Sequence, residues 1–201
     1  MKTNKLLMTL VLTCTMLWTQ AQKVEVISGD IKTVSGETKF NIQYDFSSFG
    51  VGKYGDEQSY VDAKKTEYAA KDPAKATEFE TNWKAAKTKI FQPKFETTLN
   101  KYLGSDYNVS SSNTTAKYTI ILKTKYVEPG FFAGMVKKYP YVDVEFFIVE
   151  TINTKNIVAD LSGNKMTGIA LMGPDDMKVG EAYAAAGRIF GSYMAKSLIK
   201  R

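Results

Sequence analysis

The side chains that could perform acid–base chemistry in this sequence are carboxylates on neighbouring segments. Asp143, Glu145, Glu150 and Asp160 fall in two consecutive segments with strand-like patterns. Two carboxylates that face each other across a cleft can hydrolyse a glycosidic bond. Carboxylates on a solvated strand face need a cleft and a shifted pKa before they count as a site. We therefore expect the protein not to be an enzyme, and keep a carboxylate-based glycan hydrolase as the second alternative.

Other catalytic groups are scarce in the chain. It has no histidine, and its one cysteine, Cys14, lies in an N-terminal apolar segment. Ser-His-Asp triads, Cys-His nucleophiles and thiolate or imidazole metal sites are therefore excluded from the rest of the chain. The pair Asp175-Asp176 resembles a two-carboxylate site, but at a helix start these residues more simply cap amides and oppose the dipole. We expect no metal and no cofactor.

The N-terminus carries the pattern of an export signal. Two lysines precede an apolar run from Leu6 to Trp18, and Thr19-Gln20-Ala21 is a small-x-small cleavage site. The run is shorter than the ~20 residues that span a bilayer. The sequence thus predicts a bacterial signal peptide at residues 1–21, one domain at residues 22–201, and an exported protein of the periplasm or outer cell envelope.

The charge and the cysteine refine this prediction. The apolar run continues straight through Cys14, so we do not expect lipidation there. The net charge of +6 includes Lys2 and Lys5 of the signal segment, and the remaining basic residues are not clustered. Such a mild positive charge suits an anionic envelope surface, whereas nucleic-acid binding would need a basic stripe.

Hydrophobic periodicity predicts the elements that would position these residues. Strands are expected at residues 22–28, 38–46, 117–127, 141–150 and 156–163, and helices at 56–71, 73–104 and 178–199. Pro93 should kink or break the second helix, because proline removes a helix hydrogen bond. The predicted fold is α+β (an α/β sandwich), a single mixed or antiparallel sheet of about five strands. The kinked helix and the C-terminal helix would pack on one face of it.

Two of these elements carry sharper packing signals. In residues 117–127 one strand face, predicted to be buried, alternates with a mixed one, and the buried face holds Tyr118, Ile120, Leu122, Thr124 and Tyr126. The last helix places Gly187 and Gly191 on a face of small residues. Because glycine costs about 1 kcal/mol against alanine inside a helix, two of them indicate close backbone packing against the sheet or another helix.

The connection at residues 128–140 is the candidate contact segment. Phe131, Phe132 and Met135 lie between glycines and prolines, beside Lys137 and Lys138. If exposed, these side chains would form a partner or ligand contact, with the lysines facing anionic headgroups. Because most aromatic side chains are at least partly buried, we expect the three apolar residues to fold back onto the core instead.

The second half of the chain resembles a family of bacterial envelope domains. Two strands, then Val149-Glu150-Thr151-Ile152-Asn153-Thr154-Lys155-Asn156-Ile157-Val158, then a helix rich in small residues, resemble the domain shared by the N-terminal part of TolB, the LpoB lipoprotein and CsgG-like lipoproteins. The resemblance implies an envelope protein that binds other envelope components.

Two functions from different classes remain open. The first is a non-catalytic periplasmic or cell-surface protein that binds another envelope component, either a protein or the anionic envelope surface. The alternative is a carrier of a lipid or other apolar small ligand held between sheet and helices. The carrier is motivated by an excess of aromatic residues, namely Tyr44, Phe46, Trp83, Phe91, Phe131 and Phe132.

Overall fold

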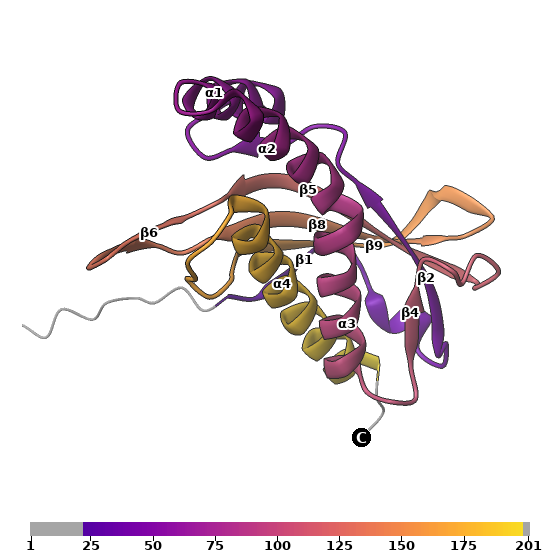
Figure 1. Ribbon diagram of the computed structural model, residues 1–201. Coiled ribbons are helices and arrows are strands. Elements are labelled where there is room, and N and C mark those ends of the chain that lie inside the picture. Colours follow the sequence, from indigo (N-terminus) through magenta and orange to yellow (C-terminus); the bar gives the residue numbers. More distant parts are fainter. Residues whose placement is uncertain (1–21, 199–201) are drawn as a thin grey trace, which may run out of the picture.

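The computed structural model describes residues 22–198, so the predicted signal peptide with Cys14 lies outside the described residues. Within them, seven strands form one mixed sheet in the order β1-β9-β8-β5-β2-β4, with β3 paired beside β5 (Figure 1). The strands are β1 Val24–Gly29, β2 Lys39–Asp45, β3 Gly50–Val51, β4 Asn108–Ser110, β5 Tyr118–Glu128, β8 Tyr141–Glu150 and β9 Asn153–Thr167. Two further strands, β6 Phe131–Ala133 and β7 Val136–Lys138, form a separate hairpin.

The prediction of an α+β fold with a mixed sheet is confirmed, and the sheet is larger than the expected five strands. The extra members, β3 and β4, are only two and three residues long, and both pair in parallel with longer strands. Strands this short show no hydrophobic alternation, so the sequence pattern did not predict β4, which lies in a polar segment. The last strand, β9, is also longer than expected, because it runs on to Thr167.

The long central strands bury the face that their alternation predicts. Val142, Val144, Phe146 and Ile148 of β8 are at most 2% exposed. In β5 the prediction holds as far as Thr124, after which the register shifts against β8. This bulge makes Val127 a core residue and leaves Tyr126 half-buried, which corrects the expected placement of Tyr126.

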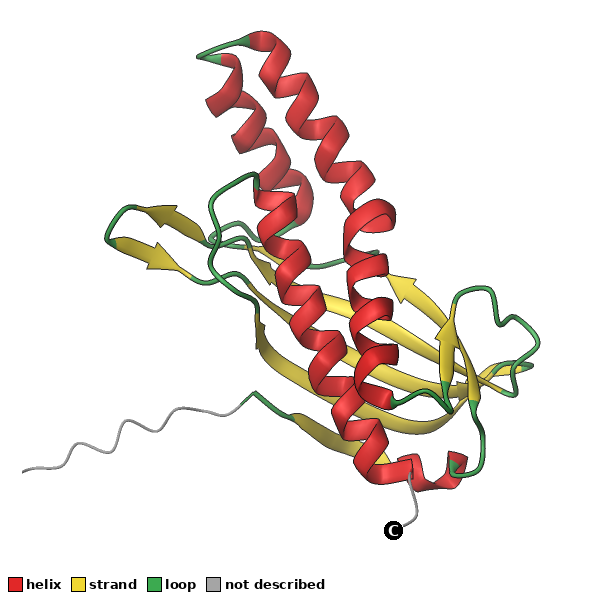
Figure 2. Ribbon diagram, turned by 60° about the horizontal axis from the view of Figure 1, so that its bottom comes forward, coloured by secondary structure: helices red, strands yellow, loops and turns green. Residues whose placement is uncertain are grey.

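The helices lie mainly on one face of the sheet (Figure 2). They are α1 Glu57–Ala69, α2 Pro73–Ala86, α3 Gln92–Leu103 and α4 Asp175–Leu198. The chain stays helical between α2 and α3 through a π-helical stretch, Lys87–Phe91, in which the Gln92 amide donates to the Lys87 carbonyl. Of the predicted kink or break at Pro93, the break does not occur: the helix continues, and the π-helical stretch just before Pro93 interrupts the regular α-helical hydrogen bonding there.

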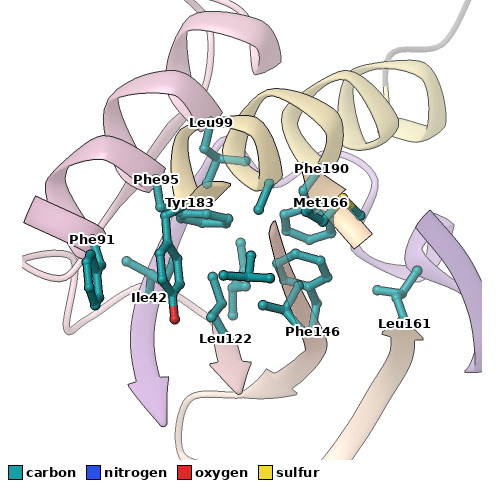
Figure 3. Close-up of a cluster of buried hydrophobic side chains, with 14 of the residues drawn as sticks. Ile42, Phe91, Phe95, Leu99, Leu122, Phe146, Leu161, Met166, Tyr183 and Phe190 are labelled. Carbon is teal, nitrogen blue, oxygen red and sulfur yellow. The ribbon is translucent and has the colours of Figure 1, made fainter. Parts of the chain in front are cut away.

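Helices α3 and α4 touch through the predicted small residues. A Cβ added at Gly187 would stand 2.4 Å from the Phe95 carbonyl oxygen, and one at Gly191 would stand 2.5 Å from the Leu99 carbonyl oxygen. Beneath the two helices, Phe146 of β8 stacks on Phe190 with ring centres 3.9 Å apart (Figure 3). The space between sheet and helices is thus filled with side chains where these elements meet.

Residues 22–198 hold no helix with both the length and the apolar character that crossing a membrane requires.

Candidate contact surface

The β6–β7 hairpin (Phe131–Lys138) projects beyond the end of the main sheet (Figure 1). Its side chains do not fold back onto the core, which corrects our expectation: Phe131 is 46% exposed, Phe132 40% and Met135 102%. Val136 and Tyr139 add 61% and 43% exposed side chains to the same projection. The structure therefore realises the alternative, an exposed apolar segment next to Lys137 and Lys138, which are both exposed.

Backbone pairing explains why the apolar side chains cannot reach the core. Phe131 pairs with Lys138 and Ala133 with Val136, so Gly134 and Met135 form a two-residue turn. Gly134 has φ +59°, the positive value that a type II′ hairpin turn needs at its first central position. The sequence carried this signal, because Gly-X between two short apolar pairs is a hairpin signature. Once the hairpin closes, its strands point away from the helices.

A buried carboxylate fastens the base of the hairpin. Glu128, the last residue of β5, is only 6% exposed. One of its oxygens accepts from the Gly130 amide at 3.0 Å, and the other lies 2.5 Å from the Lys138 Nζ. The Tyr126 hydroxyl lies 3.4 Å from that second oxygen and donates to the Gly52 carbonyl at 2.8 Å. Glu128 therefore ties both ends of the hairpin to the sheet, a role that the sequence did not reveal.

Gly130 is the second fixed point of the base. Its φ is +67°, and an added Cβ would stand 2.5 Å from the Lys138 carbonyl oxygen and 2.8 Å from the Pro140 nitrogen. Its carbonyl accepts from the Nζ of Lys178, which is 7% exposed. A larger residue would push the two strands apart at their root. The chain thus holds the hairpin at a defined place instead of leaving it as a loose loop.

A surface groove of about 500 Å³ lies between the hairpin base and α1. Four lysines and three carboxylates line it: Lys53, Lys64, Lys138, Lys178, Glu67, Glu128 and Asp175. Most of these charges are paired, since Lys178 contacts Asp175 at 2.6 Å and Lys64 contacts Glu67 at 3.1 Å. These ion pairs help to fix the hairpin base, and they leave little unpaired charge in the groove.

Two tyrosines of this region are held in their neutral form. Burial, with Asp175 next in importance, raises the pKa of Tyr60, whose hydroxyl donates to Asp175 at 2.5 Å. Burial also raises the pKa of Tyr126, with Tyr141 and Glu128 as further causes. Both hydroxyls therefore remain hydrogen-bond donors at neutral pH, that of Tyr60 to Asp175 and that of Tyr126 to the Gly52 carbonyl.

The carboxylates considered for catalysis do not gather in a cleft. Asp143, Glu145 and Asp160 lie on the sheet face turned away from the core residues of their strands, and Glu150 lies beside the β8–β9 turn. Burial raises the pKa of Asp160, and the nearby Glu145 adds to this shift. None of the four lines the hairpin groove or the smaller hollow, of about 160 Å³, between α1, α2 and the start of α4.

The Asp175-Asp176 pair lies in the N-terminal turn of α4, where carboxylates oppose the helix dipole. Asp175 and Asp176 occupy the first turn of the helix, as predicted, and the Met177 amide donates to Asp176 at 2.9 Å. Asp175 is used twice more, by Tyr60 and by Lys178. Among residues 22–198 no three acidic side chains come together as a metal site would require.

Comparisons with known proteins identify no family. The chain matches no protein-family model and no curated protein. Among solved structures, a PelC dodecamer from Paraburkholderia phytofirmans is 14% identical with a TM-score of 0.35, covering 81% of this chain and 95% of that one. A variant of that dodecamer is 13% identical with a TM-score of 0.36, covering 82% and 96%. Likeness at this level carries no conclusion, and the resemblance to the TolB, LpoB and CsgG domains stays a prediction.

Proposed function

We propose that the protein is a non-catalytic protein of the periplasm or outer cell envelope that binds another envelope component through the β6–β7 hairpin. The single observation that carries this proposal is the combination of an exposed apolar projection and a fixed base. Phe131, Phe132 and Met135 are exposed, while Glu128 and Lys178, which hold the base, are buried. Leaving this apolar surface in water gains no stabilisation, whereas covering it with a partner would, and contiguous exposed apolar surface marks interaction sites.

The predicted export signal supports the cellular place in this proposal. The apolar run and cleavage pattern at residues 1–21 direct a chain out of the cytoplasm, and the resemblance to envelope domains points the same way. We accordingly propose that the mature protein comprises residues 22–201. Its partner would be another constituent of the bacterial envelope.

The alternative of an apolar-ligand carrier has less support. A carrier between sheet and helices needs space there, yet α3 and α4 approach so closely that Gly187 has no room for a methyl group. Phe91 and Tyr183 also stack with ring centres 4.9 Å apart where α4 meets the end of the π-helical stretch. Native mass spectrometry of residues 22–201, purified without detergent, would favour this alternative if it revealed a bound mass that is lost on denaturation.

Sedimentation with isolated bacterial envelopes tests the proposal. The test compares the mature chain with the double variant Phe131→Ser/Phe132→Ser. The matched control is Ile152→Ser/Ile157→Ser, which removes two apolar side chains, 96% and 51% exposed, at the opposite end of β8. We expect the hairpin variant to remain in the supernatant and the control to sediment like the unmodified protein. Equal sedimentation of the hairpin variant and the unmodified protein would refute the proposal.

A further inference from the structure

We propose that the envelope component covering the hairpin is an anionic lipid surface, into which the tip of the hairpin inserts. This inference rests on the proposed function and specifies its partner.

Both faces of the hairpin carry apolar side chains, each beside one lysine. Residues that pair across the two strands share a face, so Phe131, Ala133, Val136 and Lys138 lie on one side, and Phe132 and Lys137 lie on the other. Tyr139 joins Phe132, because the Lys137 Nζ stands 5.1 Å from its ring centre. A protein partner with a flat surface would cover one face and leave the other in water. A lipid layer surrounds an inserted projection and removes both faces from water at once.

The order of side chains along the hairpin also favours a lipid layer. Met135 and Val136, at the far end, are purely apolar and the most exposed. Phe132 and Phe131 follow toward the base, and Lys137 and Lys138 lie level with them, because they pair with these two residues across the strands. Each strand rises about 3.3 Å per residue, so three residues reach about 10 Å, the depth at which interfacial segments sit. An apolar tip, followed by rungs that pair aromatic with cationic side chains, matches the order of a bilayer from its acyl chains to its headgroups.

The charge of the hairpin favours an anionic surface. Residues 129–142 contain two lysines and no carboxylate. Lys138 is engaged by Glu128, whereas Lys137 has no carboxylate within ion-pair distance among the described residues. Lys137 is therefore the lysine whose charge is available to a headgroup. Near a lipid surface one such charge contributes about 1 kcal/mol, a factor of about five in affinity, which falls with added salt.

The apolar surface continues beside the hairpin base. The Gly168 amide donates to the Pro140 carbonyl at 2.9 Å, which places the start of the β9–α4 loop next to the end of the hairpin. That loop exposes Ile169 by 63% and Met172 by 78%. A lipid surface meeting the hairpin would therefore have a second apolar contact available, as a shallow insertion requires.

Flotation with vesicles tests this inference. The probes are vesicles of equal parts phosphatidylglycerol and phosphatidylcholine, and vesicles of phosphatidylcholine alone, each mixed with residues 22–201. We expect flotation with the anionic vesicles, at least tenfold weaker binding for Phe131→Ser/Phe132→Ser, and about fivefold weaker binding for Lys137→Gln. The control Ile152→Ser/Ile157→Ser should float like the unmodified chain. Unchanged urea unfolding midpoints would establish that the variants are folded.

The outcomes separate this inference from the proposed function. If the unmodified protein fails to float with anionic vesicles, or the hairpin variant floats equally well, the lipid inference is wrong. If in that case hairpin-dependent sedimentation with whole envelopes persists, a protein or glycan partner takes the place of the lipid and the proposed function stands. If the hairpin variant also sediments with whole envelopes as well as the unmodified protein does, both the lipid inference and the proposed function are overturned.

Discussion

The contact between α3 and α4 makes a strong prediction about Gly187. Replacing Gly187 by alanine adds one methyl group 2.4 Å from both the Phe95 carbonyl oxygen and the Thr98 hydroxyl oxygen. Ordinary contact begins at 3.4 Å, so the helices must separate locally by about 1 Å. Overpacking of this kind costs about 1–3 kcal/mol, and the better helix propensity of alanine returns about 1 kcal/mol. Because the obstacle is backbone, the overpacking cost should lie in the upper part of this range, about 2–3 kcal/mol, so we expect Gly187→Ala to lower the free energy of unfolding by about 1–2 kcal/mol.

Gly180→Ala is the matched variant in the same helix. Its methyl group would stand 2.6 Å from the side chain of Ile90 and 3.0 Å from that of Lys94, both half-buried, and would meet no backbone atom of α3 among its nearest neighbours. We expect Gly180→Ala to cost at least about 1 kcal/mol less than Gly187→Ala, because the propensity gain is the same in both.

Urea unfolding measures the difference between the two variants. Trp83 is the only tryptophan of residues 22–201 and is 1% exposed, so its fluorescence reports the loss of the core. In a thermal scan, 1 kcal/mol corresponds to about 2–4 °C for a domain of this size. If Gly187→Ala is as stable as the unmodified protein, or if the two variants are equally destabilised, the close α3–α4 contact is wrong. The close packing of α3 and α4 would then no longer count against a ligand held between sheet and helices.

Two further predictions concern the carboxylates of Glu128, which is buried, and Asp160, which is half-buried. Glu128→Gln removes a charge-assisted tie worth about 1.5–3 kcal/mol, so we expect amides of the β6–β7 hairpin to exchange at least tenfold faster by mass spectrometry and the urea midpoint to fall; unchanged exchange would remove Glu128 as the anchor. Burial raises the folded-state pKa of Asp160, so its ionised form destabilises the fold at neutral pH, and this penalty disappears as pH falls through the folded pKa toward about 4. Asp160→Asn should therefore raise the urea midpoint at neutral pH and lose this advantage in acid, and a gain that persists in acid would contradict the assignment.

Local rules explain why much of the framework could be predicted from the sequence. Alternation located β5 and β8, because one face of each strand packs against helices while the other does not. Asp72 before a proline marked the start of α2, where its side chain accepts from the Ala74 amide, and Gly104 marked the end of α3. Each of these signals lies within a few residues of the feature that it predicts.

Features that depend on distant partners could not be predicted in this way. Strand β4 exists because β2 offers it a parallel partner about 70 residues away in the chain, and its own three residues carry no pattern. The shift in β5 after Thr124 depends on the register of β8. The prediction for Phe131 and Phe132 failed for a related reason: general burial statistics describe side chains near a core, and the Gly134 turn closes the hairpin outside it.

The most direct test of the central claim is photo-crosslinking in bacteria that export the protein. One variant carries a photo-reactive amino acid in place of Met135 at the hairpin tip, and the other carries it in place of Ile152, 96% exposed in the β8–β9 turn. We expect envelope adducts, lipid above all, from position 135 and few from position 152. Equal yields from both positions, or adducts from position 152 alone, would contradict the assignment of the hairpin as the contact surface.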